Sequence, residues 1–140
     1  MPERIGWTFS VDVTGGPKLK ARESVDVEAY DKVSVTVPGG EEASPGTATV
    51  EVQPADDPLD LRLLAITASR YDAKLTYDVH AGSATGAEDV ALDGPQLLSG
   101  AGAVGLLRQP PQSLVFSNGL GEGEDVDVTV FVARKALVTT

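Results

Sequence analysis

Apolar and polar residues alternate strictly in several stretches of this chain. The clearest stretch lies near the N-terminus, where every second residue is apolar: Ile5, Trp7, Phe9, Val11 and Val13. Alternation of period two over this length predicts a β-strand with one buried face and one face in water. We therefore expect a first strand over residues 4–13, with Trp7 and Phe9 in the core. It should end at Thr14–Pro17, whose composition is typical of a turn.

The same alternation recurs along the rest of the chain. The sets of residues expected to point inward are Val25, Val27 and Ala29; Val33, Val35 and Val37; Ala48, Val50 and Val52; Ala73, Leu75, Tyr77 and Val79; Val90 and Leu92; and Val126, Val128, Val130 and Val132. Between the first two of these sets, Asp31-Lys32 predicts a tight reversal. The run Leu114–Phe116 is apolar without a gap, which is typical of a central strand covered on both faces.

The segment 59–68 changes the phase of its alternation. Apolar residues occupy positions 59, 61 and 63, and then positions 64, 66 and 68. Such a switch predicts a β-bulge, or a strand that is buried on each face in turn as it passes between two sheets. A helix is the alternative, because leucine, arginine and alanine favour helices.

Nine or ten short strands separated by Gly, Pro, Asn and Asp turns predict an all-β protein. Residues 1–140 are expected to form a single domain, an antiparallel β-sandwich of the jelly-roll type. An immunoglobulin-like sandwich is the alternative. It is less well supported because the chain has no cysteine, and so lacks the Cys–Trp–Cys spacing of immunoglobulin domains.

The charge balance argues against two classes of partner. The chain carries 21 acidic and 11 basic side chains, a net charge of −10. Binding to nucleic acid or to an anionic membrane needs clustered lysine and arginine, so neither partner is expected. The sequence also has no apolar span of transmembrane length and no signal-peptide pattern. We therefore expect a soluble protein. Its compartment is not determined by the sequence, and association with a virion or another assembly stays open.

The sequence contains few of the side chains and motifs that catalysis requires. The chain has a single histidine, His80, and no nucleophile motif. The pattern Gly-Ala-Gly-Ala-Val-Gly at residues 100–105 resembles a dinucleotide fingerprint, but Pro110 and Pro111 leave too little chain for the helix that would receive the pyrophosphate. We therefore predict no enzymatic activity and no cofactor.

Two acidic segments are candidate calcium sites. Glu122, Glu124, Asp125 and Asp127 lie in or beside a glycine-rich loop, and Asp56, Asp57 and Asp60 lie between and after two prolines. Calcium prefers oxygen ligands on flexible loops. The spacing of an EF-hand is absent, so solvated turns are the favoured interpretation and no metal site is predicted. Calcium binding by the loop Glu122 to Asp127 is left open.

The segment 94–111 is long and apolar, with Arg108 as its one charged residue. Apolar side chains are costly to leave in water, and exposed apolar patches on soluble domains mark contact surfaces. The residues predicted to contact a neighbouring chain are Leu97, Leu98, Val104, Leu106 and Leu107, with Phe131 and Leu137 as a second patch. Phe131 lies on the outward phase of the last strand. The alternative is that a second layer of the same chain covers it.

The resulting hypothesis is a non-enzymatic structural protein that associates with itself, as a trimer or another homo-oligomer, or decorates a larger scaffold such as a virion shell or surface appendage. One rival is a carbohydrate-binding or calcium-dependent adhesion module, which would need Tyr30, Tyr71 or Tyr77 grouped with acids. The other rival is a β-sandwich enzyme, in which His80 would converge with Asp78, Asp12 and Asp26.

Overall fold

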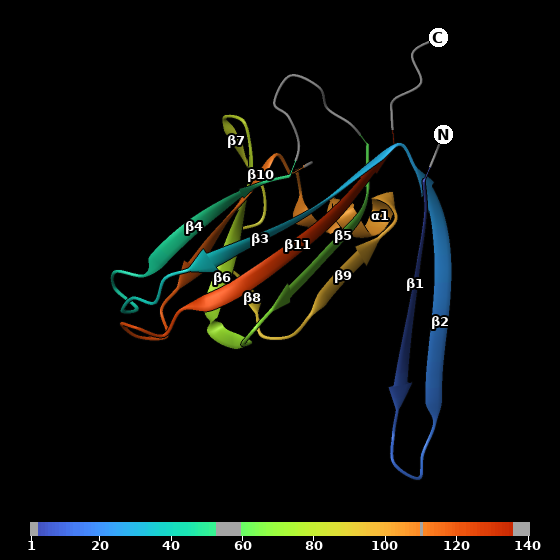
Figure 1. Ribbon diagram of the computed structural model, residues 1–140, viewed down its shortest axis with the longest axis horizontal. Helices are drawn as coiled ribbons and strands as arrows, with labels where there is room; N and C mark the ends of the chain where they lie inside the picture. Colours follow the sequence, from blue (N-terminus) through green and yellow to red (C-terminus); the bar gives the residue numbers. More distant parts are fainter. Residues whose placement is uncertain (1–2, 53–59, 110, 136–140) are drawn as a thin grey trace.

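The computed structural model describes residues 3–52, 60–109 and 111–135, and strands dominate it (Figure 1). The strands fall into three antiparallel groups. A two-stranded hairpin consists of β1 (Glu3–Asp12) and β2 (Lys18–Val27). A four-stranded sheet contains β3 (Ala29–Val37), β5 (Asp60–Ala68), β9 (Gln96–Ser99) and β11 (Val126–Lys135). A five-stranded sheet contains β4 (Gly46–Glu51), β6 (Asp72–Ala81), β7 (Ala84–Thr85), β8 (Val90–Leu92) and β10 (Ser113–Asn118).

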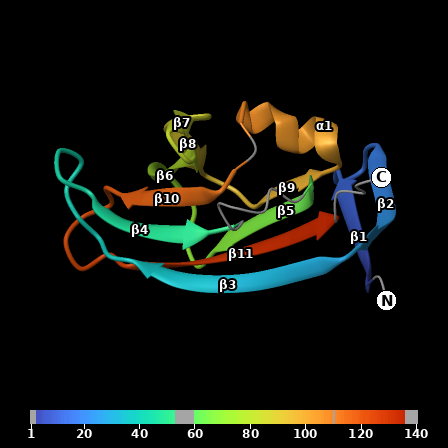
Figure 2. The ribbon, with the colours of Figure 1, turned by 90° about the horizontal axis from the view of Figure 1, so that it is seen from above.

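The two larger sheets pack face to face as the layers of a β-sandwich (Figure 2). The four-stranded sheet has the order β3-β11-β5-β9. The five-stranded sheet has the order β4-β10-β6-β7, with β8 also paired to β6. Successive strands from β3 to β6, and again from β8 to β11, alternate between the two sheets. The predicted all-β antiparallel sandwich is therefore confirmed.

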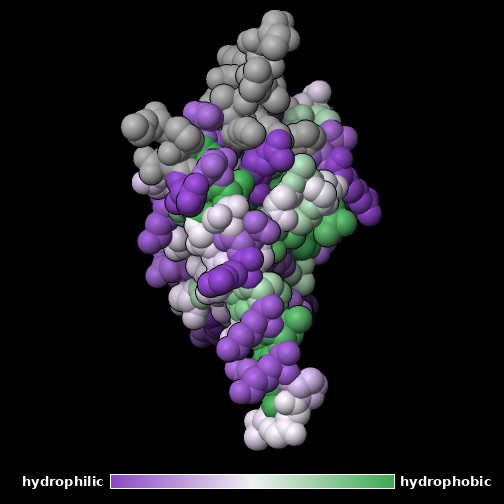
Figure 3. Space-filling view, turned by 90° about the vertical axis from the view of Figure 1, so that its right-hand side faces the viewer, coloured by the Kyte–Doolittle hydropathy of each residue, from purple (hydrophilic) through white to green (hydrophobic). Residues whose placement is uncertain are grey.

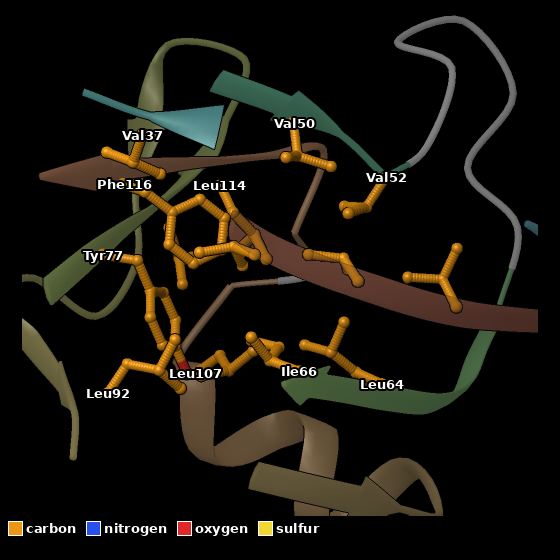
Figure 4. Close-up of a cluster of buried hydrophobic side chains, with 14 of the residues drawn as sticks. Val37, Val50, Val52, Leu64, Ile66, Tyr77, Leu92, Leu107, Leu114 and Phe116 are labelled. Carbon is orange, nitrogen blue, oxygen red and sulfur yellow. The ribbon is translucent and has the colours of Figure 1, made fainter. Parts of the chain in front are cut away.

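The core lies between these sheets and is built from the inward phase of each strand (Figure 4). Val126, Val128, Val130 and Val132 are each at most 2% exposed, as their alternation predicts. The rings of Tyr77 and Phe116 meet in the same core with centroids 5.6 Å apart. Because each fully buried side chain of this size contributes about 1.5–3 kcal/mol, this layer is the main source of stability.

Strand β5 contains the predicted β-bulge. Its pairing with β11 shifts by one residue, so that Arg134 lies opposite Leu61 and Ala133 lies opposite Leu63. As a result Leu61 and Leu64 both pack into the core between the sheets, while Leu63 packs on the outer face of the four-stranded sheet. The phase switch in the sequence was therefore a bulge, and the helix alternative is wrong.

The turn predicted at Asp31-Lys32 is wrong. Strand β3 runs without interruption through these residues and pairs along its length with β11. The chain instead changes direction at Glu28, whose N–H donates to the carbonyl of Arg134 at 2.9 Å. The prediction that Leu114–Phe116 is covered on both faces holds only in part. Leu114 and Phe116 are fully buried, but Val115 is partly exposed on the outer face.

A one-turn helix, α1 (Ala101–Val104), and a 3-10 turn (Gly105–Leu107) follow β9. Val104 and Leu107 point from them into the core and are only 6% and 4% exposed. The turn is held by a hydrogen bond of 2.9 Å from the Ala87 N–H to the Leu107 carbonyl. No helix in the described ranges is long and apolar enough to cross a bilayer.

Tyr77 gives the sandwich a predicted response to alkaline pH. Its hydroxyl donates to the Gln96 side-chain oxygen at 2.6 Å, and burial raises its pKa from 10.0 to about 12. The unfolded chain loses this proton above about pH 10 and the folded chain keeps it, so the free energy of unfolding should fall by about 2–3 kcal/mol between pH 10 and 12. In urea titrations from pH 9 to pH 12, the free energy of unfolding of Tyr77→Phe should be lower than that of the wild type at pH 9 and should decrease less between pH 10 and 12. An equal decrease in the two proteins would contradict the prediction.

Candidate functional site

The hairpin of β1 and β2, residues 3–27 and here called the arm, belongs to neither sheet of the sandwich. It crosses one end of the sandwich, and its turn extends beyond the sheets (Figure 1). Its strands pair from Glu3 opposite Val27 to Asp12 opposite Lys18. Within the described part of the chain, no other strand pairs with either edge. The arm is thus a two-stranded ribbon with two open edges.

Local sequence explains why the arm forms. The turn is closed by hydrogen bonds from the Gly16 N–H to the Val13 carbonyl at 2.8 Å and from the Val13 N–H to the Pro17 carbonyl at 3.2 Å. Gly15 adopts a φ of +70°, which a residue without a Cβ reaches at little cost. Apolar residues face one another across the strands, such as Val11 opposite Leu19. These cross-strand pairs give the ribbon one apolar face.

The base of the arm is attached to the sandwich by a second hydrophobic cluster. This cluster lies on the outer face of the four-stranded sheet and comprises Val27, Leu63 and Ala133, with Ile5, Trp7, Val25 and Phe131 packed against it. The Trp7 indole N–H also donates to the Ser99 hydroxyl at 2.9 Å. The arm base is therefore a partial second layer over Phe131, whose ring also stacks on Tyr30 with centroids 5.8 Å apart.

Beyond this base the apolar face of the arm is uncovered. Its residues Phe9, Val11, Val13 and Leu19, here called the distal stripe, are 41%, 50%, 52% and 58% exposed. The described residues include seven exposed large hydrophobic side chains, and four of them belong to this stripe. The Phe9 ring stacks on that of Trp7 at 5.8 Å, so the stripe continues directly from the anchored base.

The exposure of the distal stripe corrects the prediction that the whole apolar face of the first strand is buried. Alternation identifies which side chains share a face, but it does not identify what covers that face. One residue did carry a signal. Glu23 stands among the apolar positions of β2, opposite Trp7, and it is exposed. A charged side chain in the apolar phase indicates a face that is not fully enclosed.

Charge is distributed unevenly between the arm and the rest of the chain. The arm holds four basic and four acidic side chains, so the 17 acidic and seven basic residues outside it account for the whole net charge of −10. Three of the four basic residues, Lys18, Lys20 and Arg22, lie in the distal part of β2 and are exposed. In Figure 3 the narrow lower part is the distal arm, where hydrophilic and hydrophobic surfaces lie side by side.

Of the residues predicted from the sequence to form an interface, the structure places some on the surface and others in the core. Leu97 and Leu106 are on the surface, 39% and 74% exposed. Leu98 is partly buried against the core. Val104 and Leu107 are corrected to core residues of this chain, because the turns after β9 direct both side chains inward between the sheets. Leu137 lies outside the described residues.

The candidate residues for catalysis and for sugar binding lie apart. His80 and Asp78 are on β6, where the Asp78 carboxylate accepts the Asp89 N–H at 2.7 Å. Asp12 and Asp26 are on the arm, and Asp26 forms an exposed ion pair with Arg4 at 3.2 Å. The three tyrosines do not form one platform. Tyr77 is in the core, and Tyr71 packs against the core, where its hydroxyl accepts the Ala68 N–H at 3.2 Å. Tyr30 stacks on Phe131.

The acidic loop before β11 binds other parts of the protein. Asp125 accepts the Gly39 N–H at 3.0 Å, and Glu124 pairs with Arg70 at 3.1 Å. Asp127 accepts the Thr36 hydroxyl at 2.7 Å. Among the described residues, no three acidic or histidine side chains are close enough to hold a metal ion. Asp56 and Asp57 lie outside those residues, as does the side chain of Asp60.

The strongest candidate site is therefore the arm, with its distal stripe and its basic residues. Comparison with known proteins gives no relative from which a role could be transferred: no protein-family model, no curated protein and no solved structure matches the chain.

Proposed function

We propose that this protein is a non-enzymatic structural subunit that associates with copies of itself through the arm. The observation that carries the proposal is the distal stripe, a continuous apolar surface on a ribbon with two open edges. A two-stranded hairpin is marginally stable in water on its own. Exposed apolar patches on soluble domains mark contact surfaces. A partner that covers the stripe would remove its apolar side chains from water and would stabilise the hairpin.

The expected energy gain favours an assembly with several contacts over a tight pair. Burying the exposed half of the four side chains in the stripe offers about 3–6 kcal/mol. Association costs about 4–15 kcal/mol in lost motional freedom, so one such contact alone is weak. A subunit that makes two or more contacts in a closed or extended assembly offsets this cost through multivalency. The trimer expected from the sequence is one such closed form.

The strand order supports a jelly-roll arrangement of the sandwich. In an immunoglobulin-like sandwich, strands that follow one another in sequence pair within one sheet, as in the order A-B-E-D. Here β3 to β6 and β8 to β11 alternate between sheets, with orders β3-β11-β5-β9 and β4-β10-β6-β7. Jelly rolls occur in virus capsids and lectins. A place on a virion shell or surface appendage follows from that fold-level analogy.

Self-association through the stripe is testable with Phe9→Ser combined with Val11→Ser, here called the arm variant. Both side chains are about half exposed, so the variant should fold. In sedimentation velocity across micromolar to millimolar concentrations, the wild type should form larger species. The arm variant should need at least about tenfold higher concentration, because the lost burial exceeds about 1.4 kcal/mol.

The matched control is Thr8→Ala combined with Ser10→Ala, which changes the opposite, polar face of the same strand. This control should associate as the wild type does. A wild type that stays monomeric at every concentration, or an arm variant that associates as strongly as the wild type, would refute the proposal.

A further inference from the structure

We infer that the arm of one copy docks on the body of the next copy, where the body means residues 28–135, rather than on that copy's arm. The inference rests on the proposed self-association and adds its geometry. An arm-to-body contact is heterologous, because each chain donates an arm and receives one. Contacts of this kind generate closed rings, open chains or, where two copies exchange arms, a dimer with two such contacts, whereas arm-to-arm pairing generates a dimer with one self-complementary contact.

Charge is the first argument for the body as the receiving surface. Residues 8–22 of the arm carry Lys18, Lys20 and Arg22 against one acid, Asp12. None of the three basic side chains forms an ion pair with another described residue. The body, with 17 acidic and seven basic side chains, accounts for the whole net charge of −10. Opposite charges steer arm and body together, while arm-to-arm pairing would bring two basic segments close.

Geometry is the second argument. The base of the arm is already fixed on its own body by the cluster around Leu63 and by the Trp7 hydrogen bond to Ser99. The distal part extends beyond that body, which therefore cannot cover the stripe without releasing the base (Figure 1). A second copy can cover it without any rearrangement.

The receiving surface is assigned to the segment from residue 88 to residue 106. Among the described residues outside the arm, three large hydrophobic side chains are exposed, and two of them, Leu97 and Leu106, lie in this segment. Glu88, Asp89 and Asp93 lie at its beginning, and all three are exposed. Strand β9 within it forms an edge of the four-stranded sheet. The segment thus offers apolar contacts for the stripe and carboxylates for the basic residues.

The test is complementation between two altered chains. The arm variant keeps an intact receiving surface, and a body variant, Leu97→Ser combined with Leu106→Ser, keeps an intact arm. Both sets of side chains are exposed, and melting curves and circular dichroism would check that each variant folds. Each variant alone should be monomeric. The mixture can form only one arm-to-body contact, which is weak. Mixed in equal amounts at up to millimolar concentration, the two variants should form a heterodimer of one arm variant with one body variant, detected by sedimentation velocity with one chain labelled.

The possible outcomes separate the inference from the proposed function. Heterodimers in the mixture support both. A wild type that associates, with variants that do not complement each other and an arm variant that is excluded from wild-type assemblies, would overturn the arm-to-body contact and leave self-association standing. A monomeric wild type would overturn both.

The chain with Lys18→Glu, Lys20→Glu and Arg22→Glu provides a second check. It should associate more weakly than the wild type. Added salt should weaken association of the wild type, because it screens the attraction between arm and body, and it should not weaken association of this variant.

Discussion

Replacing Gly46 with alanine is expected to prevent folding of the sandwich, or to lower its free energy of unfolding by more than about 4 kcal/mol. Gly46 begins β4 and lies against the turn that leaves β3. A Cβ at this position would overlap the carbonyl oxygen of Pro38 and lie 2.7 Å from its carbon. Both are backbone atoms, so they cannot rotate away as a flexible side chain would. The turn between the two sheets would have to move.

Urea titration followed by circular dichroism measures this effect. The matched control is Gly102→Ala in α1, where the added Cβ would meet no atom within 4 Å other than its chain neighbours and the backbone of the helix itself. Alanine is favoured over glycine in a helix by up to about 1 kcal/mol, so this control should be as stable as the wild type or slightly more stable. A Gly46→Ala protein with a wild-type urea midpoint would contradict the prediction.

The second large effect is expected at Asn118, which is fully buried at the end of β10. Its amide nitrogen donates to the carbonyls of Val37 at 3.1 Å and Glu124 at 2.8 Å, and its oxygen accepts the Leu120 N–H at 3.0 Å. One side chain thereby joins β3 and the loop before β11. Asn118→Asp keeps the shape but turns a carboxylate oxygen toward two carbonyl oxygens. We expect a loss of about 3–5 kcal/mol at neutral pH, as for a buried charge without a partner.

Asn118→Ala separates the charge from the lost hydrogen bonds. It should cost about 2–3 kcal/mol at every pH, because it leaves buried backbone groups unpaired without adding a charge. The deficit of Asn118→Asp should shrink on acidification, since protonation removes the negative charge and restores one donor. Urea titrations of both variants at neutral and acidic pH would show this. A deficit of Asn118→Asp that is no larger than that of Asn118→Ala at neutral pH would refute the argument.

The sandwich itself was predictable because the alternation along each strand indicates which of its side chains are buried. The four valines from Val126 to Val132 alternate with polar residues and all point into the core. The bulge was also predictable, because an extra residue in a strand changes which positions face the core. The register shifts between Leu61 and Leu63, so that Leu61 and Leu64 both face inward. These features depend on local periodicity, and local periodicity is contained in the sequence.

The candidate site was less predictable because it depends on which surfaces meet. Phe9 alternates as regularly as any core residue, yet its face extends beyond the sheets. Val104 and Leu107 lie in a segment without periodicity, and only the fold reveals that they close the core. Phe131 was correctly placed on the outward face, but the layer that partly covers it comes from residues more than a hundred positions away.

The position of β11 has a consequence for the order in which the molecule is made. Strand β11 lies between β3 and β5 in the four-stranded sheet, although it follows both of them in the sequence. During translation the arm can pair as soon as it leaves the ribosome, since its two strands are neighbours. The four-stranded sheet has no centre until β11 has been synthesised. The base of the arm packs on Phe131 and Ala133 of β11, so the arm is not anchored before that point either. The attachment of the arm and the closure of the sandwich are therefore completed together, once β11 has left the ribosome.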